Sequence, residues 1–295
     1  MLTRKQISLL DEKGISTLHD FRILSLTAGE PYLEDGVLSY FDGRLVTACG
    51  FPLRGAALIE ETSLRDLSKY WIKERSAEGI IHIGPQSLDL RCLRAFSLRR
   101  VEKFRGQNFS AELMIKCNGN SDEVFKHRFY RRSCSRGFKS TVKTGGILSA
   151  EHLKLIETFY SRREITCYLA EMAFAIPAVL RSRRVSLIEA RQNGRLCGFL
   201  ALHESFKDML VALFLYHDHQ TPGVSDFLYG EMLRYASRLG AASVNVGPSP
   251  TRGHYNFKLK WGGESAVPPY YLLGWMRGRL RLRWHKAWGP RLVRL

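Results

Sequence analysis

The order of strand-like and helix-like segments in the second half of the chain constrains the fold more than any other feature. Two strand-like runs between residues 185 and 203 flank Asn193-Gly194, a pair whose positive φ angles suit a two-residue hairpin turn. A buried apolar run at 209–216 then leads through a tight loop into an amphipathic helix over 224–239, and a further strand follows. This alternation predicts an α/β fold.

The remaining elements follow the same local signals. Helical apolar spacing predicts helices over 63–79, 122–136, 149–163, 168–182 and 253–261, and short apolar runs predict strands over 37–41, 44–51, 80–84 and 109–117. The run at 267–275 predicts an edge strand, because its prolines cannot donate to a ladder. The hairpin sequence Asp42-Gly-Arg-Leu is similar to Asn193-Gly-Arg-Leu one domain length later, which hints at duplication, although hairpins often reuse these turn residues.

Length and composition exclude several classes of protein. The chain has 295 residues, 45% of them apolar, which suits two medium-sized globular domains and excludes a disordered or low-complexity protein. The longest apolar run, at 168–180, is interrupted by Glu171 and Pro177 and is too short to span a membrane. The N-terminus lacks the apolar core of a signal peptide, and the six cysteines form no CxxC pair. We therefore expect a cytoplasmic protein with reduced thiols.

The net charge of +17 is concentrated in two segments. Residues 91–143 contain 14 lysines and arginines and four acidic residues, and residues 277–295 contain seven basic residues and no acidic one. Residues 277–285 alternate arginine with leucine and tryptophan, in a pattern that suits either a strand with one cationic face or a cationic helix. Both segments predict contact with an anionic membrane surface or RNA; the alternative is a solubilising charge with no specific partner.

A tight loop between the apolar run and the helix at 224–239 is the strongest local sign of a binding site. The two elements are connected by a short segment that contains Gln220, Thr221, Gly223, Val224 and Ser225. Amide groups at a helix N-terminus attract anions, and glycine lets the backbone approach a pyrophosphate closely. The alternative is an ordinary strand-to-helix turn.

Gln220-x-x-Gly-x-Ser225 resembles the Gln/Arg-x-x-Gly-x-Gly/Ala motif of the GNAT acyltransferase superfamily, whose loop amides hold the pyrophosphate of acyl-coenzyme A. The order of elements in the second half is also similar. The chain departs from the motif at Ser225, where glycine or alanine is usual, and at Pro222. The resemblance implies that Gln220, Thr221, Gly223, Val224 and Ser225 bind acyl-coenzyme A as co-substrate.

A second motif, Tyr255-Asn-Phe-Lys-Leu-Lys-Trp-Gly-Gly263, resembles the Phe-Lys…Trp-Gly-Gly segment of the Fem-like branch of that superfamily, which includes peptidoglycan-bridge aminoacyltransferases and tandem-GNAT relatives of the BioF2 type. The similarity covers about residues 125–275. It implies an α/β protein of two tandem GNAT-like domains with mixed central sheets flanked by helices. The expected divisions are a degenerate N-terminal domain at 1–120, an acyltransferase domain at 121–276 and a basic aromatic tail at 277–295.

The candidate catalytic residues are Asp218, Tyr255 and Lys258. Asp218 follows the central strand, where a base can face the attacking amine, and alternation places His217 and His219 together on the other side as substrate-binding residues. Lys258 suits an oxyanion, and Arg252 suits a substrate phosphate; the alternative for both is solvation. The resemblance implies that Tyr255 protonates the leaving group. A zinc site from His203, His217 and His219 lacks a fourth ligand, so we predict no metal.

The predicted function is an N-acyltransferase that moves an acyl group from acyl-coenzyme A to an amine-bearing acceptor. Two alternatives stay open. The first is an aminoacyl-tRNA-dependent Fem-like aminoacyltransferase, which the basic charge favours, although the chain lacks the helical arm that many Fem relatives insert. The second is a non-catalytic RNA- or membrane-binding protein on the same fold. The expected location is the cytoplasm, with peripheral contact at the inner face of the membrane.

Overall fold

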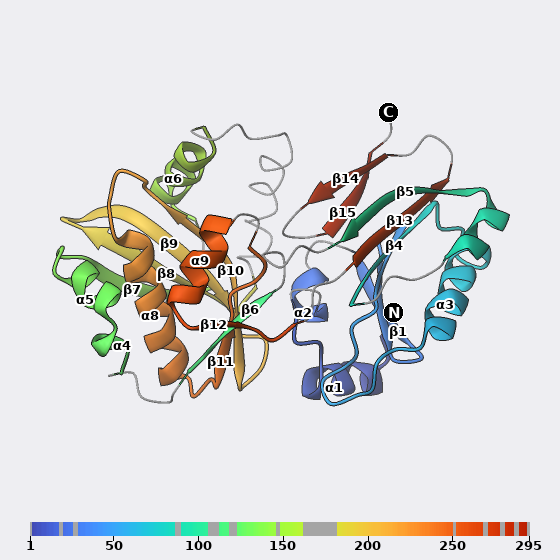
Figure 1. Cartoon of the computed structure of the whole chain (residues 1–295), viewed down its shortest axis with the longest axis horizontal. Coiled ribbons are helices and arrows are strands. Elements are labelled where there is room, and N and C mark those ends of the chain that lie inside the picture. Colours follow the sequence, from blue (N-terminus) through green and yellow to red (C-terminus); the bar gives the residue numbers. More distant parts are fainter. Residues whose placement is uncertain are drawn as a thin grey trace. The chain divides into compact units, whose positions relative to one another are not determined.

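The computed structural model of the chain consists of two compact units (Figure 1). Unit 1 comprises residues 1–111 and 267–295, and unit 2 comprises residues 112–266. The structure describes residues 2–17, 20–25, 29–85, 90–105, 112–117, 123–145, 148–161, 182–249, 252–267, 271–277, 281–285 and 289–293. The helix predicted over 168–182 lies outside these residues except at its last position.

Unit 1 is built on a mixed six-stranded sheet in the order β1-β2-β3-β4-β13-β5. The strands are β1 (Glu30–Glu34), β2 (Val37–Phe41), β3 (Leu45–Cys49), β4 (Gly79–Gly84), β13 (Tyr271–Arg277) and β5 (Leu98–Arg105). The helices are α1 (Arg4–Glu12), α2 (Phe21–Leu24) and α3 (Glu61–Lys73), and a 3₁₀ turn spans Arg91–Phe96. Only β3 and β4 run parallel, with α3 as the connection between them.

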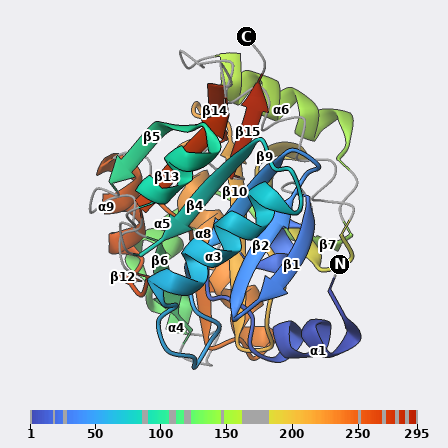
Figure 2. The same cartoon turned by 90° about the vertical axis from the view of Figure 1, so that its right-hand side faces the viewer.

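Alternation along the strands divides the core of unit 1 into two clusters, one on each face of the sheet. On β4, Ile80 packs into the cluster that includes Trp71 of α3, whereas Ile81 packs into the cluster that includes Leu10 of α1. Successive strand residues point to opposite faces, so one continuous apolar strand serves both clusters. Figure 2 shows α3 lying across one face of this sheet.

Unit 2 is built on a seven-stranded sheet in the order β12-β6-β11-β10-β9-β8-β7. The strands are β6 (Leu113–Lys116), β7 (Lys139–Thr144), β8 (Val185–Gln192), β9 (Arg195–His203), β10 (Met209–His217), β11 (Ser243–Asn245) and β12 (Gly263–Ser265). The helices are α4 (Glu123–Lys126), α5 (Arg128–Cys134), α6 (Ala150–Ser161), α8 (Val224–Arg238) and α9 (Arg252–Lys260).

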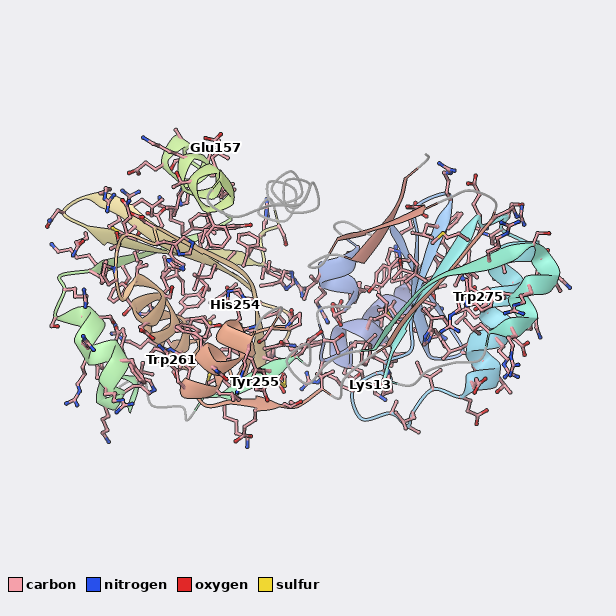
Figure 3. The ribbon with its side chains drawn as sticks, turned by 45° about the horizontal axis from the view of Figure 1, so that its top comes forward. Lys13, Glu157, His254, Tyr255, Trp261 and Trp275 are labelled. Atoms are coloured by element: carbon pink, nitrogen blue, oxygen red, sulfur yellow. The ribbon has the colours of Figure 1, made fainter. Side chains whose placement is uncertain are left out.

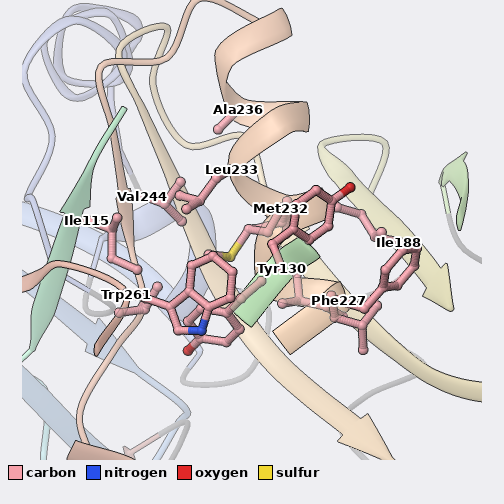
Figure 4. Close-up of a cluster of buried hydrophobic side chains, with 14 of the residues drawn as sticks. Ile115, Tyr130, Ile188, Phe227, Met232, Leu233, Ala236, Val244 and Trp261 are labelled. Carbon is pink, nitrogen blue, oxygen red and sulfur yellow. The ribbon is translucent and has the colours of Figure 1, made fainter. Parts of the chain in front are cut away.

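The core of unit 2 lies between its sheet and α8. Figure 4 shows Phe227, Met232 and Leu233 of this helix packed against side chains from the sheet, from α5 and from Trp261, which follows α9. Because α8 contributes most of its length to this cluster, its N-terminus, where the predicted binding loop lies, is held rigidly at the end of β10.

The two units repeat one pattern of strand neighbours and directions. In unit 1 the strand order is β1-β2-β3-β4-β13-β5, and each neighbouring pair is antiparallel except β3 and β4. In unit 2 the order β8-β9-β10-β11-β6-β12 is likewise antiparallel except for β10 and β11. In each unit one helix, α3 or α8, connects the parallel pair. The fold is therefore a tandem repeat of one mixed α/β unit.

The similar hairpin sequences do not mark this repeat. Asp42-Gly43 joins β2 to β3, whereas Asn193-Gly194 joins β8 to β9, which corresponds to β1–β2 of unit 1. The counterpart of Asn193-Gly194 is Asp35-Gly36, and all four of these residues have positive φ angles. The similarity is therefore one of turn chemistry rather than of position.

The predicted edge strand at 267–275 is an internal strand, and the prediction of an edge is wrong. β13 pairs with β4 on one side and β5 on the other, and Leu273, Trp275 and Met276 are buried. The described strand comprises residues 271–277, and the prolines at 268 and 269, on which the prediction of an edge depended, lie outside the described residues. The strand ends where the predicted acyltransferase domain was expected to end, yet it belongs to unit 1.

The observed division of the chain thus differs from the expected domain boundaries at 120 and 276. The segment from residue 267 onward returns to unit 1, because β13 fills a position in its sheet that no earlier strand fills. Of the predicted tail, β14 (Arg281–His285) and β15 (Gly289–Val293) form an antiparallel hairpin, so the strand interpretation holds for these residues.

Candidate functional site

The parallel pair of unit 2 separates after three residue pairs. β10 has nine residues, but β11 pairs with it only from Met209↔Ser243 to Val211↔Asn245. From Ala212 to His217, β10 therefore has a neighbouring strand only on the β9 side. In unit 1 the equivalent strands stay paired through all five residues of β3. Beyond Val211, β11 therefore does not pair with the backbone of Ala212 to Leu215 in the described structure, whereas the parallel pair of unit 1 is complete.

The predicted binding loop joins the open end of β10 to α8. Gly223 is the N-cap of α8, with φ of 86°, and no side chain caps the helix within the described residues. The first amides of a helix have no partner inside it, so this end attracts an anion. A Cβ atom on Gly223 would lie 3.3 Å from Cδ and from Nε of Arg136, which places that arginine beside the loop.

Asp218 organises the loop through both carboxylate oxygens. The Gln220 amide donates to Oδ1 at 2.9 Å, and the Thr221 hydroxyl donates to Oδ2 at 3.1 Å. Arg195 pairs with Oδ2 at 3.2 Å and also donates to the Thr221 hydroxyl oxygen at 3.1 Å. The side chain is buried, so its observed contacts are those of a loop-stabilising residue, and its role as general base stays a prediction.

His217 and His219 lie together, as alternation predicts. Their ring centroids are 4.4 Å apart, and Phe159 of α6 stacks on His219 at 5.3 Å. Phe159 also meets Tyr216 edge to face at 5.1 Å. This ring cluster lies at the end of β10, beyond the residues that pair with β11. His203, the third residue of the zinc alternative, is buried and interacts with Ser205, with 2.9 Å between Nδ1 and Oγ.

The helix predicted at 253–261 forms as α9 and carries the other candidates (Figure 3). Tyr255 is half-buried against the core, Lys258 is buried, and Arg252 is exposed at the start of the helix. The Lys258 ammonium donates to the carbonyl oxygens of Gly247 at 3.0 Å and Pro248 at 2.8 Å. Burial lowers the pKa of Lys258 to about 7, because the charged form loses its hydration.

The loop below Lys258 is itself braced from two sides. Asn245 donates to the buried carboxylate of Glu112 at 2.7 Å and accepts from the Gly247 amide at 2.8 Å. The charge of Glu112 raises the pKa of Lys258 and so opposes the effect of burial. These contacts fix the segment that follows β11 and the lysine that lies on it.

The Trp-Gly-Gly sequence has a structural explanation. Trp261 donates from its indole to Asp226 at 3.1 Å, which joins the end of α9 to the first turn of α8. Gly262 has φ of 80°, a conformation that terminates a helix, and a Cβ on Gly263 would lie 2.9 Å from the Lys258 carbonyl oxygen. The motif therefore holds α9 against α8 and positions the backbone of Lys258.

Arg136 and Arg195 were not among the predicted site residues. Their positions depend on contacts between elements far apart in the sequence: Arg136 follows α5 and Arg195 begins β9, yet both lie beside the loop at 218–223. The basic composition of 91–143 was the only signal for Arg136, and no pattern singled out Arg195. Among the described residues, no group of three His, Cys, Asp or Glu side chains is arranged to hold a metal ion.

Comparison with known proteins identifies similar folds among solved structures but no matching sequence family. No family model matches the chain, and no curated protein matches it. Among solved structures, FemX is 12% identical with a TM-score of 0.56, covering 92% of this chain and 96% of that one. L-PGS from Bacillus licheniformis is 13% identical with a TM-score of 0.54, covering 94% and 92%. A conserved protein of unknown function from Bacteroides thetaiotaomicron is 14% identical with a TM-score of 0.59, covering 87% and 90%.

These matches extend over both units. The chain is therefore an α/β protein of the GNAT/Fem-like fold, with two tandem mixed sheets flanked by helices. The closed parallel pair of unit 1 and the open one of unit 2 agree with the expectation that the N-terminal domain is the degenerate one.

Proposed function

We propose that the protein is an N-acyltransferase in which unit 2 binds acyl-coenzyme A and transfers its acyl group to an amine. The observation that carries the proposal is the separation of β10 from β11 directly beside the uncapped N-terminus of α8. The amides of Gly223 to Ser225 would hold the pyrophosphate, and Arg136 and Arg195 would add positive charge beside it. The backbone of Ala212 to Leu215, with which β11 does not pair, would pair with the amides of the pantetheine arm.

Lys258 suits stabilisation of the oxyanion that forms when the amine attacks the thioester. Two of its three hydrogens go to backbone carbonyls, which fixes the ammonium group and leaves one hydrogen for a ligand. With a pKa lowered to about 7, Lys258 can also exchange a proton near neutral pH. Tyr255, one turn away on α9, is the proposed proton donor to the leaving thiolate. Asp218, at the end of β10, is the proposed base that takes the proton from the attacking amine. His217, His219 and Arg252 are the proposed contacts for the acceptor.

The donor site is tested with Gly223→Val. A β-branched residue is strained at φ of 86°, and its side chain would meet Arg136 where the phosphate is expected. At 100 times its Kd, acetyl-coenzyme A should stabilise the wild type by about 2.7 kcal/mol, measured by thermal unfolding, and this shift should vanish in the variant.

Gly240→Val is the matched control, because Gly240 lies at the other end of α8 with φ of 73° and nothing within 4 Å of an added Cβ. Its intrinsic stability should fall, but the shift with coenzyme A should remain. A full shift in Gly223→Val would show that the donor binds elsewhere.

The oxyanion role is tested with Lys258→Met. Loss of one preorganised donor lowers turnover by about 10²–10³, whereas donor affinity should change little. The variant also leaves two backbone carbonyls unsatisfied, so activity is compared per folded molecule, with the folded fraction read from urea unfolding. Turnover near that of the wild type would assign Lys258 a purely structural role.

Aminoacyl-tRNA is the second candidate donor, because the exposed Arg136 and Arg195 beside the loop would equally contact the phosphates of an RNA backbone. The same thermal-unfolding assay distinguishes the two donors: a shift with tRNA that persists in Gly223→Val, together with none from coenzyme A, would favour the RNA donor.

A further inference from the structure

The outer face of α4 and α5 carries four cations, and the one acidic residue in these two helices is Glu123, at the start of α4. Lys126, Arg128, Arg131 and Arg132 are exposed, and no acidic residue occurs between Glu123 and Glu151. Arg128, Arg131 and Arg132 occupy positions i, i+3 and i+4, which lie on one side of a helix. Within the described part of the chain, none of the four forms an ion pair. We call these four residues and Phe125 the α4–α5 face.

The opposite side of α5 is fixed to α8. Tyr130 is fully buried, its hydroxyl donates to Glu231, and its ring packs so closely on Gly230 that an added Cβ would lie 2.0 Å away. The backbone that carries the cations of the α4–α5 face is therefore held in place, so their charges stay concentrated on one side of α5. A surface of this kind is stabilised when an anionic partner neutralises it.

The exposed apolar side chains near these cations help to distinguish between a nucleic acid and an anionic bilayer as the partner. Phe125, among the cations, is 40% exposed, and Leu259 of the neighbouring α9 is 43% exposed. The Arg234 guanidinium lies 4.4 Å from the ring of Phe125, and the Arg128 guanidinium lies 4.6 Å from the ring of Phe129. Stacking of nucleic-acid bases on these rings would displace the guanidinium groups, whereas insertion among headgroups needs only the exposed part of the Phe125 side chain. Cations that surround exposed apolar side chains match the headgroup region of an anionic bilayer instead.

We propose that the α4–α5 face docks unit 2 on an anionic phospholipid surface. The cations would contact headgroup phosphates, and Phe125 would enter the boundary between headgroups and acyl chains. No helix in the described residues is long and apolar enough to cross a membrane. The proposal goes beyond the transferase function and does not depend on it, because docking is measured without donor or acceptor.

The test is sedimentation of the full chain with phosphatidylcholine vesicles that contain or lack phosphatidylglycerol. Each basic side chain near an anionic surface strengthens binding by about fivefold, so the triple variant Arg128→Gln/Arg131→Gln/Arg132→Gln should bind about 100-fold more weakly. Phe125→Gln should weaken binding to the same vesicles by severalfold. The matched control is Arg4→Gln/Lys5→Gln/Lys13→Gln, which removes three exposed charges around α1 of unit 1 and should change binding by about twofold at most.

The same proteins are titrated with duplex RNA. The proposal is overturned if the triple variant binds vesicles as the wild type does, or if its loss equals that of the α1 control. It is also overturned if the triple variant loses RNA binding while the wild type does not bind phosphatidylglycerol vesicles, since the face would then be a nucleic-acid site. Thermal unfolding confirms that each variant is folded; the mutated arginines are exposed and form no ion pair in the described structure.

Discussion

His82 of β4 is a fully enclosed imidazole in the middle of unit 1. It is 2% exposed, its Nε2 has no hydrogen-bond partner in the described structure, and Gly50 and Gly84 pack against the ring. A Cβ on Gly50 would lie 2.7 Å from Nε2, so only glycine leaves room there. Burial lowers the pKa of His82 to about 4, because the imidazolium would lose its hydration without gaining a partner.

This pKa predicts a loss of stability in acid. The unfolded chain takes up a proton on His82 below about pH 6.5, whereas the folded chain does so only near pH 4. The free energy of unfolding should therefore fall between pH 6.5 and pH 4, by about 3 kcal/mol from this group. Urea unfolding of unit 1 at several pH values measures the loss, and His82→Gln should remove that part of it. An identical pH profile in the variant would show that His82 is hydrated in the folded state.

The contacts of Lys258 are compatible both with a structural role and with the proposed stabilisation of an oxyanion. Its bonds to Gly247 and Pro248 hold the segment after β11, and the same bonds orient the ammonium group. Asp218 likewise has a structural role through its contacts with Gln220, Thr221 and Arg195, and its role as general base stays a prediction.

At the scale of elements, α5 and α8 lie so close together that packing, rather than helix propensity, determines how a substitution at Gly230 changes the stability. Ala is favoured over Gly inside a helix by about 1 kcal/mol. Gly230→Ala should nevertheless destabilise the protein by about 1–3 kcal/mol, because the new Cβ would lie 2.0 Å from the Tyr130 ring. Urea unfolding measures the change. Ser237→Ala, in the last turns of the same helix, is the control and should be neutral or slightly stabilising.

A stability gain in Gly230→Ala would mean that α5 can move away from α8 at little cost. In that case the α4–α5 face would not be held rigidly, and the repulsion among its cations could be relieved by motion.

At the scale of the whole molecule, the sheet of unit 1 is completed by β13, a strand that follows all of unit 2 in the chain. β13 lies between β4 and β5, so a chain that ends at residue 266 lacks the central neighbour of both strands. We expect such a chain to retain unit 2 and to lose protection in unit 1, because β4 and β5 would each expose unpaired backbone groups. A chain that ends at residue 277 keeps β13 and should retain both units.

Hydrogen exchange of the two shortened chains provides the measurement. Slow exchange of the β3 and β4 amides in the chain that ends at 266 would contradict the prediction, since it would require β4 and β5 to pair without β13.

The sequence by itself predicted the features that depend on neighbouring residues. The Asn193-Gly194 turn, the helix over 253–261 and the strand-loop-helix at 209–239 all formed, because turn φ angles and apolar periodicity are local properties. The type of fold followed from the order of these elements together with the motif at 220–225 and the motif at 255–263. The site residues themselves were named from the same two motifs and the end of β10.

Only the tertiary structure decided which strands become neighbours and which side chains meet. Nothing local distinguishes the internal strand β13 from an edge strand, because the residues of β4 and β5 that pair with it lie between 166 and 197 positions earlier in the chain. In the same way, Arg136 lies beside Gly223 because Tyr130 packs on Gly230 and brings α5 to the start of α8. A sequence pattern indicates which face of a helix or strand is buried. The elements that pack against this face are determined by long-range contacts, which depend on the shape of the whole core.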